Sequence, residues 1–312
     1  MQKDSAQGRW RGVLAAVLMG TVILLLSLPA AAGEWEGLKQ RLSKDGFDRL
    51  DIEALFRRAD LRFDPEPMAV KITELMKSLH RQSSGKENAI SRMVYRQYLR
   101  PGRLRSAHDY MERHRDLLGR INRDYCVPRE VVVSIALIET NLGVNTGKRK
   151  AFHVLSSMAA AGDLELVRPY LAGGVVHEGN EEQARQRCRE KAAWAYNELK
   201  YLLRYSQDNG VDPLAIPGSI YGAIGLCQFM PSNVYLYGID GDGDGNIDLF
   251  STPDALSSIG NYLRRNGWKC GISGQERRQI IMTYNKNQTY ANTVLAIADR
   301  LRSGKRTRDR QR

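Results

Sequence analysis

Helical periodicity is the feature of this sequence that most constrains its fold. Apolar residues recur at spacings of three and four along most of the chain, whereas alternating strand patterns are nearly absent. The longest run extends from Glu181 to Gly210, and its final glycine can adopt the left-handed conformation that ends helices. With 312 residues and 42% hydrophobic side chains, the chain can bury one large core or two modest ones. We therefore predict a mainly α-helical protein with a smaller N-terminal part and a larger C-terminal part.

The N-terminus resembles a secretory signal. Basic residues precede an apolar run over residues 13–28, and three consecutive alanines end at Ala32. This pattern predicts a signal peptide over residues 1–32, cleavage near Ala32, and export to the periplasm or cell envelope. An uncleaved membrane anchor is the alternative, because the apolar run approaches the length that spans a bilayer.

The chain is strongly basic. Its formal net charge is +12, and residues 1–32 contribute three basic residues and one acid, so a chain without them would carry +10. A basic exported protein suits an anionic partner, such as a membrane surface, nucleic acid or an acidic wall polymer, but solubility explains the charge equally well. We predict that the basic tail over residues 303–312 is a solvated end, with electrostatic attachment as the alternative. We expect a monomer without a nucleic-acid partner, and leave membrane-surface association open.

Four cysteines are present, at Cys126, Cys188, Cys227 and Cys270. They lack the close spacing of a zinc site. In an oxidising compartment they predict one or two disulfides, and the sequence cannot choose among the pairings. Buried free thiols are the alternative.

One glutamate has the position expected of a general acid. The segment from Val127 to Gly143 is predicted to be a helix, with Pro128 in its first turn and Gly143 as its stop. At 100° per residue, Glu139 lies on the apolar face of this helix, and lost hydration should raise its pKa. An acid that keeps its proton near neutral pH can protonate a leaving group. The alternative is a glutamate at a helix end that faces water or pairs with a lysine.

A glycine-rich, uncharged segment extends from Pro217 to Asn233. Its glycines allow a chain-like ligand to approach the backbone closely. Tyr221, Gln228 and Phe229 supply the rings and amide that hold sugars. A tightly packed core hairpin or a glycine-mediated helix contact would give the same composition.

Six motifs in one order point to a family. After a YLRPGRL lead-in come ALIETNLG, GAIGLCQFMPS, DGDGDGNIDLFSTPDAL, NYLRRNGW and TYNKNQTYA. Together they resemble the B-type membrane-bound lytic murein transglycosylases, whose catalytic domain is lysozyme-like. The resemblance extends from about Tyr95 to Leu301, and it implies an N-terminal helical region over residues 33–94 and a catalytic domain over residues 95–302.

The resemblance also implies an activity. Such enzymes cleave the β-1,4 bond between N-acetylmuramic acid (MurNAc) and N-acetylglucosamine (GlcNAc) in peptidoglycan strands, and they form 1,6-anhydro-MurNAc ends without a catalytic cofactor. Their single acid and base matches Glu139, so no second flanking carboxylate is needed, unlike in ordinary glycosidases. Motif matching places six residues in the glycan groove: Ser219, Gln228, Tyr262, Tyr284, Asn285 and Tyr290.

The sequence departs from the family pattern at two places. Asn141 and Leu142 stand where family members usually have an aromatic residue and often an arginine, and Thr283 replaces another arginine. These changes put substrate affinity in doubt and motivate a catalytically impaired peptidoglycan-binding protein as an alternative. A hydrolytic muramidase is a second alternative. Residues 160–180 match the family poorly, and their role is not assigned.

An acidic loop over residues 240–254 resembles an EF-hand calcium loop. Three aspartates occupy positions one, three and five, and the carbonyl of Asn246 stands at position seven. Position twelve is Ser251 instead of glutamate, and the family resemblance implies that Asp254, in the first turn of the next helix, is the closing acidic ligand. We predict a structural Ca²⁺ held by Asp240, Asp242, Asp244, Asn246 and Asp254. A metal-free turn cluster and a calcium sensor are the alternatives.

Overall fold

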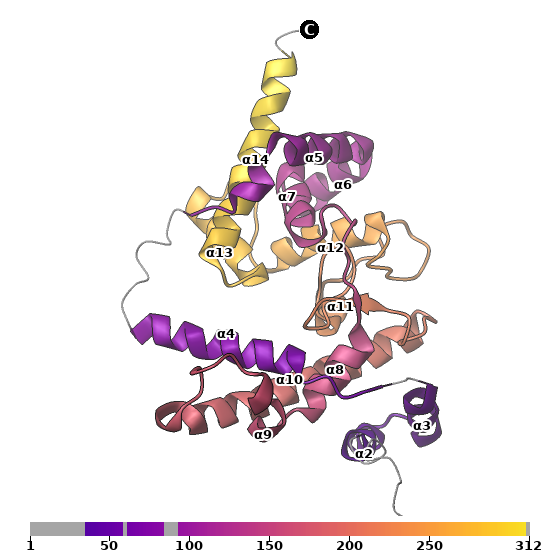
Figure 1. Cartoon of the computed structure of the whole chain (residues 1–312). Coiled ribbons are helices and arrows are strands. Elements are labelled where there is room, and N and C mark those ends of the chain that lie inside the picture. Colours follow the sequence, from indigo (N-terminus) through magenta and orange to yellow (C-terminus); the bar gives the residue numbers. More distant parts are fainter. Residues whose placement is uncertain (1–34, 59–60, 84–92, 310–312) are drawn as a thin grey trace, which may run out of the picture. The chain divides into compact units, whose positions relative to one another are not determined.

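The computed structural model describes residues 35–58, 61–83 and 93–309 (Figure 1). The predicted signal peptide therefore lies outside the described residues. The chain forms two compact units, Met1–Phe56 and Arg57–Arg312. In the described residues, no helix has both the length and the hydropathy needed to cross a membrane.

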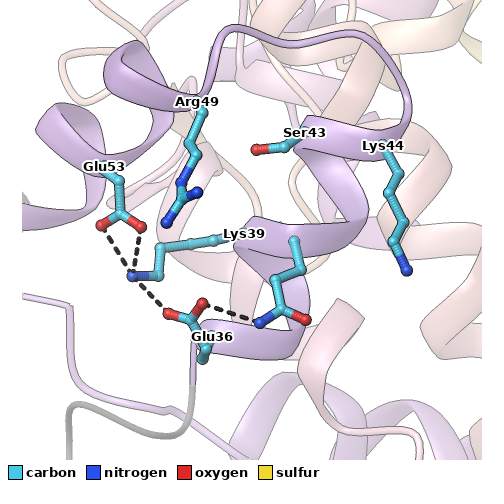
Figure 2. A pocket seen from close by; sticks show the side chains of 7 residues that line it. Glu36, Lys39, Ser43, Lys44, Arg49 and Glu53 are labelled. Carbon is cyan, nitrogen blue, oxygen red and sulfur yellow. Dashed lines mark hydrogen bonds and ion pairs between the residues drawn. The ribbon is translucent and has the colours of Figure 1, made fainter.

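The described part of the smaller unit contains two short helices, α2 (Glu36–Lys44) and α3 (Arg49–Arg58). Each buries two apolar residues, and the rings of Trp35 and Phe56 approach to 5.8 Å between centroids. Figure 2 shows a polar pocket lined by residues of α2 and α3, in which Lys39 reaches both Glu36 and Glu53 at 2.9 Å. The pocket is thus cross-linked by internal ion pairs.

The first layer of the larger unit is built on the long helix α10 (Glu181–Asp208), against which α4 (Glu66–Ser83) and α8 (Ala151–Ala160) pack. The prediction of the long helix is confirmed, and Gly210 has the expected positive φ of 61°. The helix α4 packs within the larger unit, which begins at Arg57.

The second layer surrounds α7 (Arg129–Thr140), which packs against four other helices (Figure 1). These are α5 (Pro101–Arg113), α6 (Arg115–Tyr125), α12 (Thr252–Arg265) and α14 (Gln288–Asp309). Nine of the twelve residues of α7 are buried, including all of those from Glu130 to Leu137, which explains the run of apolar residues in this helix. Pro128 is the N-cap that precedes α7, whereas the sequence predicted it within the first turn of the helix. The same layer also contains η2 (Arg96–Leu99) and α13 (Gly274–Tyr284).

Short elements lie between the longer helices of the larger unit. They are β1 (Arg149–Lys150), α9 (Leu164–Val167), η3 (Arg168–Tyr170), η4 (Glu178–Asn180), β2 (Pro217–Gly218) and α11 (Pro231–Tyr237). The strands form one antiparallel pair, with Arg149 opposite Gly218. Residues 160–180, which the family motifs leave unassigned, form a surface connection in which Arg168 and Arg185 both pair with Glu165 and Glu181.

Two further features of the larger unit differ from, or complete, the predictions. The helix α14 continues to Asp309 and so includes residues 303–309 of the predicted basic tail. A disulfide joins Cys126 to Cys270, while Cys188 and Cys227 are buried free thiols. The structure thereby selects one pairing that the sequence could not.

Candidate active site

The C-terminal end of α7 is held in an unusual conformation. The helix ends at Thr140, three residues before the predicted stop, and Asn141, Leu142 and Gly143 all have positive φ, at 53°, 63° and 91°. The hydroxyl of Thr140 donates to the carbonyl of Leu226 at 3.0 Å and accepts the N–H of Gly143 at 3.0 Å. The last turn of α7 is thus tied to the glycine-rich segment.

Glu139 lies in this last turn, with its side chain partly exposed and its carboxyl group surrounded by protein. Burial raises its pKa from 4.5 to about 7. The hydroxyl of Tyr290 donates to Oε1 of Glu139 at 2.6 Å and partly opposes this rise, because it stabilises the charged form. Such a group holds a proton close to neutral pH and can both give it up and take it back.

Behind Glu139 lies a cluster of aromatic side chains from three helices and the glycine-rich segment. Tyr290 stacks on Tyr284 at 6.4 Å between centroids, Tyr284 contacts Tyr262 at 4.9 Å, and Tyr262 contacts Phe229 at 5.6 Å. Only 1% of Phe229, 7% of Tyr262 and 3% of Tyr290 is exposed, so these rings support the site from behind. Tyr284 is partly exposed and Asn285 is exposed.

Two predicted groove residues, Ser219 and Gln228, stabilise the backbone conformation of the glycine-rich segment through side-chain hydrogen bonds. The hydroxyl of Ser219 accepts the N–H groups of Tyr221 and Ala223 at 3.2 and 3.0 Å. The amide of Gln228 donates to the carbonyls of Gly225 and Thr146 at 2.9 and 3.1 Å. These bonds fix the backbone of a compact loop and join it to the carbonyl of Thr146.

The contacts of Tyr221 lead to α4 instead of to the aromatic cluster. Its hydroxyl donates to Glu74 at 2.7 Å, and the ammonium of Lys71 lies 4.1 Å from the centre of its ring. Tyr221 therefore joins the glycine-rich segment to α4.

One supporting residue was missed by sequence reasoning. The side-chain oxygen of Asn287 accepts the N–H of Tyr290 at 3.2 Å, and its amide donates to the hydroxyl of Tyr95 at 3.0 Å. Asn287 thereby fixes the first turn of α14, from which Tyr290 reaches Glu139. An asparagine directly before a helix is a capping signal, which the sequence does carry.

The acidic loop brings three of its predicted ligands together. Carboxylate oxygens of Asp240, Asp242 and Asp244 lie within 4.8 Å of one another. Asp254 lies behind the loop with 1% of its surface exposed, and its two oxygens accept the N–H groups of Gly241 and Asp248 at 2.9 and 2.6 Å. It lies in the first turn of α12, as predicted.

The chemistry of this loop fits a hard divalent cation. Burial raises the pKa of Asp254, and the nearby charges of Asp242 and Asp240 raise it further against its two backbone donors. A cation among these oxygens would remove the repulsion, and carboxylates with a backbone carbonyl are ligands that Ca²⁺ prefers. The backbone of Asn246 is placed by a bond from its N–H to Asp244 at 2.8 Å.

Comparison with known proteins identifies the family. Residues 30–278, which are most of the chain, match the family described as the transglycosylase SLT domain. The chain belongs to this family. It is 27% identical over 234 residues to membrane-bound lytic murein transglycosylase B of Escherichia coli (strain K12), which covers 75% of this chain and 57% of that protein. The chain thus spans little more than half the length of this curated relative.

Solved structures show the same fold. Escherichia coli lytic transglycosylase Slt35 in complex with calcium matches with a TM-score of 0.64 and 19% identity, over 87% of this chain and 93% of that one. SltB3 from Pseudomonas aeruginosa in complex with NAG-NAM-pentapeptide matches with a TM-score of 0.61 and 21% identity, over 85% and 78%. The predicted family and the mainly α-helical, lysozyme-like fold class are confirmed.

Proposed function

We propose that this protein is a peptidoglycan lytic transglycosylase, and that Glu139 is its single acid and base. The observation that carries the proposal is the position of Glu139 at the end of α7, with its carboxyl group surrounded by protein and 2.6 Å from the hydroxyl of Tyr290. Burial in this position raises the pKa of Glu139 to about 7. The bond from Tyr290 lowers this pKa in part, and within the described residues no neighbouring carboxylate contributes to it. A site with one such acid suits a reaction in which an internal hydroxyl replaces a base-activated water.

The proposed reaction begins with protonated Glu139, which donates its proton to the glycosidic oxygen between MurNAc and GlcNAc. The bond from that oxygen to the anomeric carbon breaks, and the 6-hydroxyl oxygen of MurNAc attacks the carbon. The carboxylate of Glu139 then removes the proton of this hydroxyl and is restored. No water is consumed, the products are a GlcNAc end and a 1,6-anhydro-MurNAc end, and the nearby hydroxyl gains the advantage of an intramolecular attack.

The predicted groove residues have different parts in this proposal. We propose that the exposed Asn285 and the partly exposed Tyr284 contact the glycan. The buried rings of Phe229, Tyr262 and Tyr290 would instead support the wall of the site next to Glu139. The carbonyl of Thr283 accepts a hydrogen bond from the hydroxyl of Tyr262, and the side chain of Thr283 is exposed. An arginine at this position, as in the family pattern, would therefore extend into solvent next to the aromatic cluster.

Digestion of purified peptidoglycan followed by mass spectrometry tests the proposal. We expect muropeptides with anhydro ends, lighter by one water than hydrolysed ones, and no release by Glu139→Gln. Hydrolysed reducing ends would instead indicate a muramidase. Equal glycan binding by both proteins without cleavage would indicate an impaired peptidoglycan-binding protein.

We also propose a structural Ca²⁺ at the acidic loop, held by the predicted set that includes Asp254. We expect Ca²⁺ at a hundred times its Kd to stabilise the folded protein by about 2.7 kcal/mol relative to chelator. Asp242→Asn should reduce this gain, while Asp116→Asn, an exposed acid on α6, should not. The absence of any gain would favour a metal-free turn, and changes in amide exchange far from the loop would favour a sensor.

We further propose that the protein is exported as a monomer to the periplasm or cell envelope. The pattern of residues 1–32 supports export, and the name of the Escherichia coli relative supports a place at a membrane. Fractionation of cells with N-terminal sequencing tests cleavage near Ala32, and light scattering tests the oligomeric state. An intact N-terminus in the membrane fraction would favour the anchor.

A further inference from the structure

An arginine from α5 lies against the end of α7 that carries Glu139. Its Nη1 donates to the side-chain oxygen of Asn141 at 2.7 Å, and its guanidinium carbon lies 5.3 Å from the centre of the Tyr98 ring. Tyr98 in turn donates to the carbonyl of Ile138 at 3.3 Å. Arg103 thus reaches, directly or through Tyr98, the residues on both sides of Glu139.

The same neighbourhood extends to the partner of Glu139. Tyr98 lies close enough to Tyr290 to add to the raised pKa of that hydroxyl. Tyr290 is the donor to Glu139. Arg103 therefore belongs to the wall around the acid, although it lies 36 residues before it in the chain.

The charge of Arg103 has no acidic partner among the residues that the structure describes. By contrast Arg149, which is also partly buried, pairs with both Asp64 and Glu66. Asn141 is neutral, and the negative end of the α7 dipole supplies only about half a charge. A guanidinium has five donors in a fixed fork that matches a carboxylate, and the one bond to Asn141 leaves most of this capacity unused.

We propose that Arg103 is a specificity-determining residue that binds a carboxylate of the muramoyl unit next to the cleaved bond. This inference rests on the proposed function. In a peptidoglycan strand, the lactyl ether of MurNAc is either a free carboxylate or the attachment point of a stem peptide that carries carboxylates. Recognition of this group would select the muramoyl unit from its neutral GlcNAc neighbours. The stacking on Tyr98 and the bond to Asn141 hold the guanidinium ready, so little conformational entropy is lost on binding.

Three substrates separate the sources of the carboxylate. They are peptide-bearing strands, strands freed of peptide by an amidase so that the lactyl carboxylate is exposed, and the freed strands after carbodiimide conversion of that carboxylate to an amide. For Arg103→Gln we expect kcat/KM to fall about tenfold on the strands that carry the recognised carboxylate and less than about twofold on the amidated strands, since charged hydrogen bonds are lost only in the former. Arg103→Lys should lie between, because it keeps the charge without the fork.

Two further variants separate recognition from support. Asn141→Gly keeps the left-handed backbone and removes only the amide that Arg103 contacts. Arg105→Ala removes an exposed arginine on the same helix and should change no substrate preference. If Arg103 only braces α7, its variants and Asn141→Gly will lower kcat/KM equally on all three substrates.

The outcomes have separate meanings. A loss confined to peptide-bearing strands identifies the stem peptide, and a loss confined to freed strands identifies the lactyl group. Equal losses on all three substrates, with the thermal unfolding midpoint unchanged or lowered, overturn the inference. Failure of the wild type to release anhydro products from any substrate refutes the proposed function instead.

Discussion

Replacing Glu139 with glutamine should stabilise the folded protein at alkaline pH, although it removes the proposed acid. In the unfolded chain Glu139 ionises at its usual pKa of 4.5, whereas in the folded protein burial raises that pKa to about 7. Between these values the unfolded state loses its proton while the folded state keeps it. The cost of the buried carboxylate is therefore absent below 4.5, grows through this interval, and is complete above pH 7.

The magnitude follows from the difference of about 2.5 pH units, since each unit corresponds to about 1.4 kcal/mol. Relative to wild type, the free energy of unfolding of Glu139→Gln should therefore be higher by about 3 kcal/mol at pH 8 than at pH 4. Glutamine is nearly isosteric, and its amide oxygen can still accept the hydroxyl of Tyr290.

Denaturant unfolding of both proteins at the two pH values measures this difference. Glu112→Gln, an exposed glutamate on α5, is the matched control, and its stability relative to wild type should depend little on pH. If Glu139→Gln differs from wild type by the same amount at both pH values, the carboxyl group is not desolvated as described, and the argument for its role as a neutral acid fails with it.

Three further predictions test the supporting structure. Tyr290→Phe removes a bond that favours the carboxylate, so the alkaline limb of the pH profile of kcat/KM should move up by about one pH unit, and a limb that stays or moves down would contradict the geometry. Gly225→Ala should lower the free energy of unfolding by more than about 2 kcal/mol, because φ is 73° and a Cβ at this position would lie 2.4 Å from Leu249. Gly210→Ala is the control: its φ is also positive, but no atom lies within 4 Å of the added Cβ, so it should cost only about 1 kcal/mol. Replacing both Cys126 and Cys270 with serine should lower the free energy of unfolding by about 2–4 kcal/mol. If the wild type has the same free energy of unfolding under reducing and oxidising conditions, the disulfide does not stabilise the protein.

The helices could be predicted where apolar residues repeat at helical spacing over a long run. The ends of helices could be predicted where the sequence contains a capping residue. The helix α10 and the first turn of α12 at Asp254 agree with the sequence. The end of α7 was predicted wrongly because Leu142 rarely adopts positive φ, and only its contacts in the folded protein hold it there. The sequence could not show which helices α4 packs against, because such contacts join residues far apart in the chain.

The candidate site could be predicted only in the parts that depend on local sequence patterns. Glu139 follows from its place on an apolar helix face, and its pKa has the predicted direction. The sequence could not separate a ring that lines a groove from one that supports it. Phe229 and Tyr284 both belong to recognised motifs, yet Phe229 is buried while Tyr284 is partly exposed.

By itself, the sequence determined the helical class, the acid on the apolar face and the order of motifs that places the chain in its family. These depend on residue types and on spacings along one helix or loop. Only the tertiary structure decided which cysteines pair, which hydroxyl donates to Glu139 and which neutral residue accepts the hydrogen bond of Arg103. The physical reason is distance along the chain, since Tyr290 lies 151 residues from Glu139 and no local pattern encodes their contact.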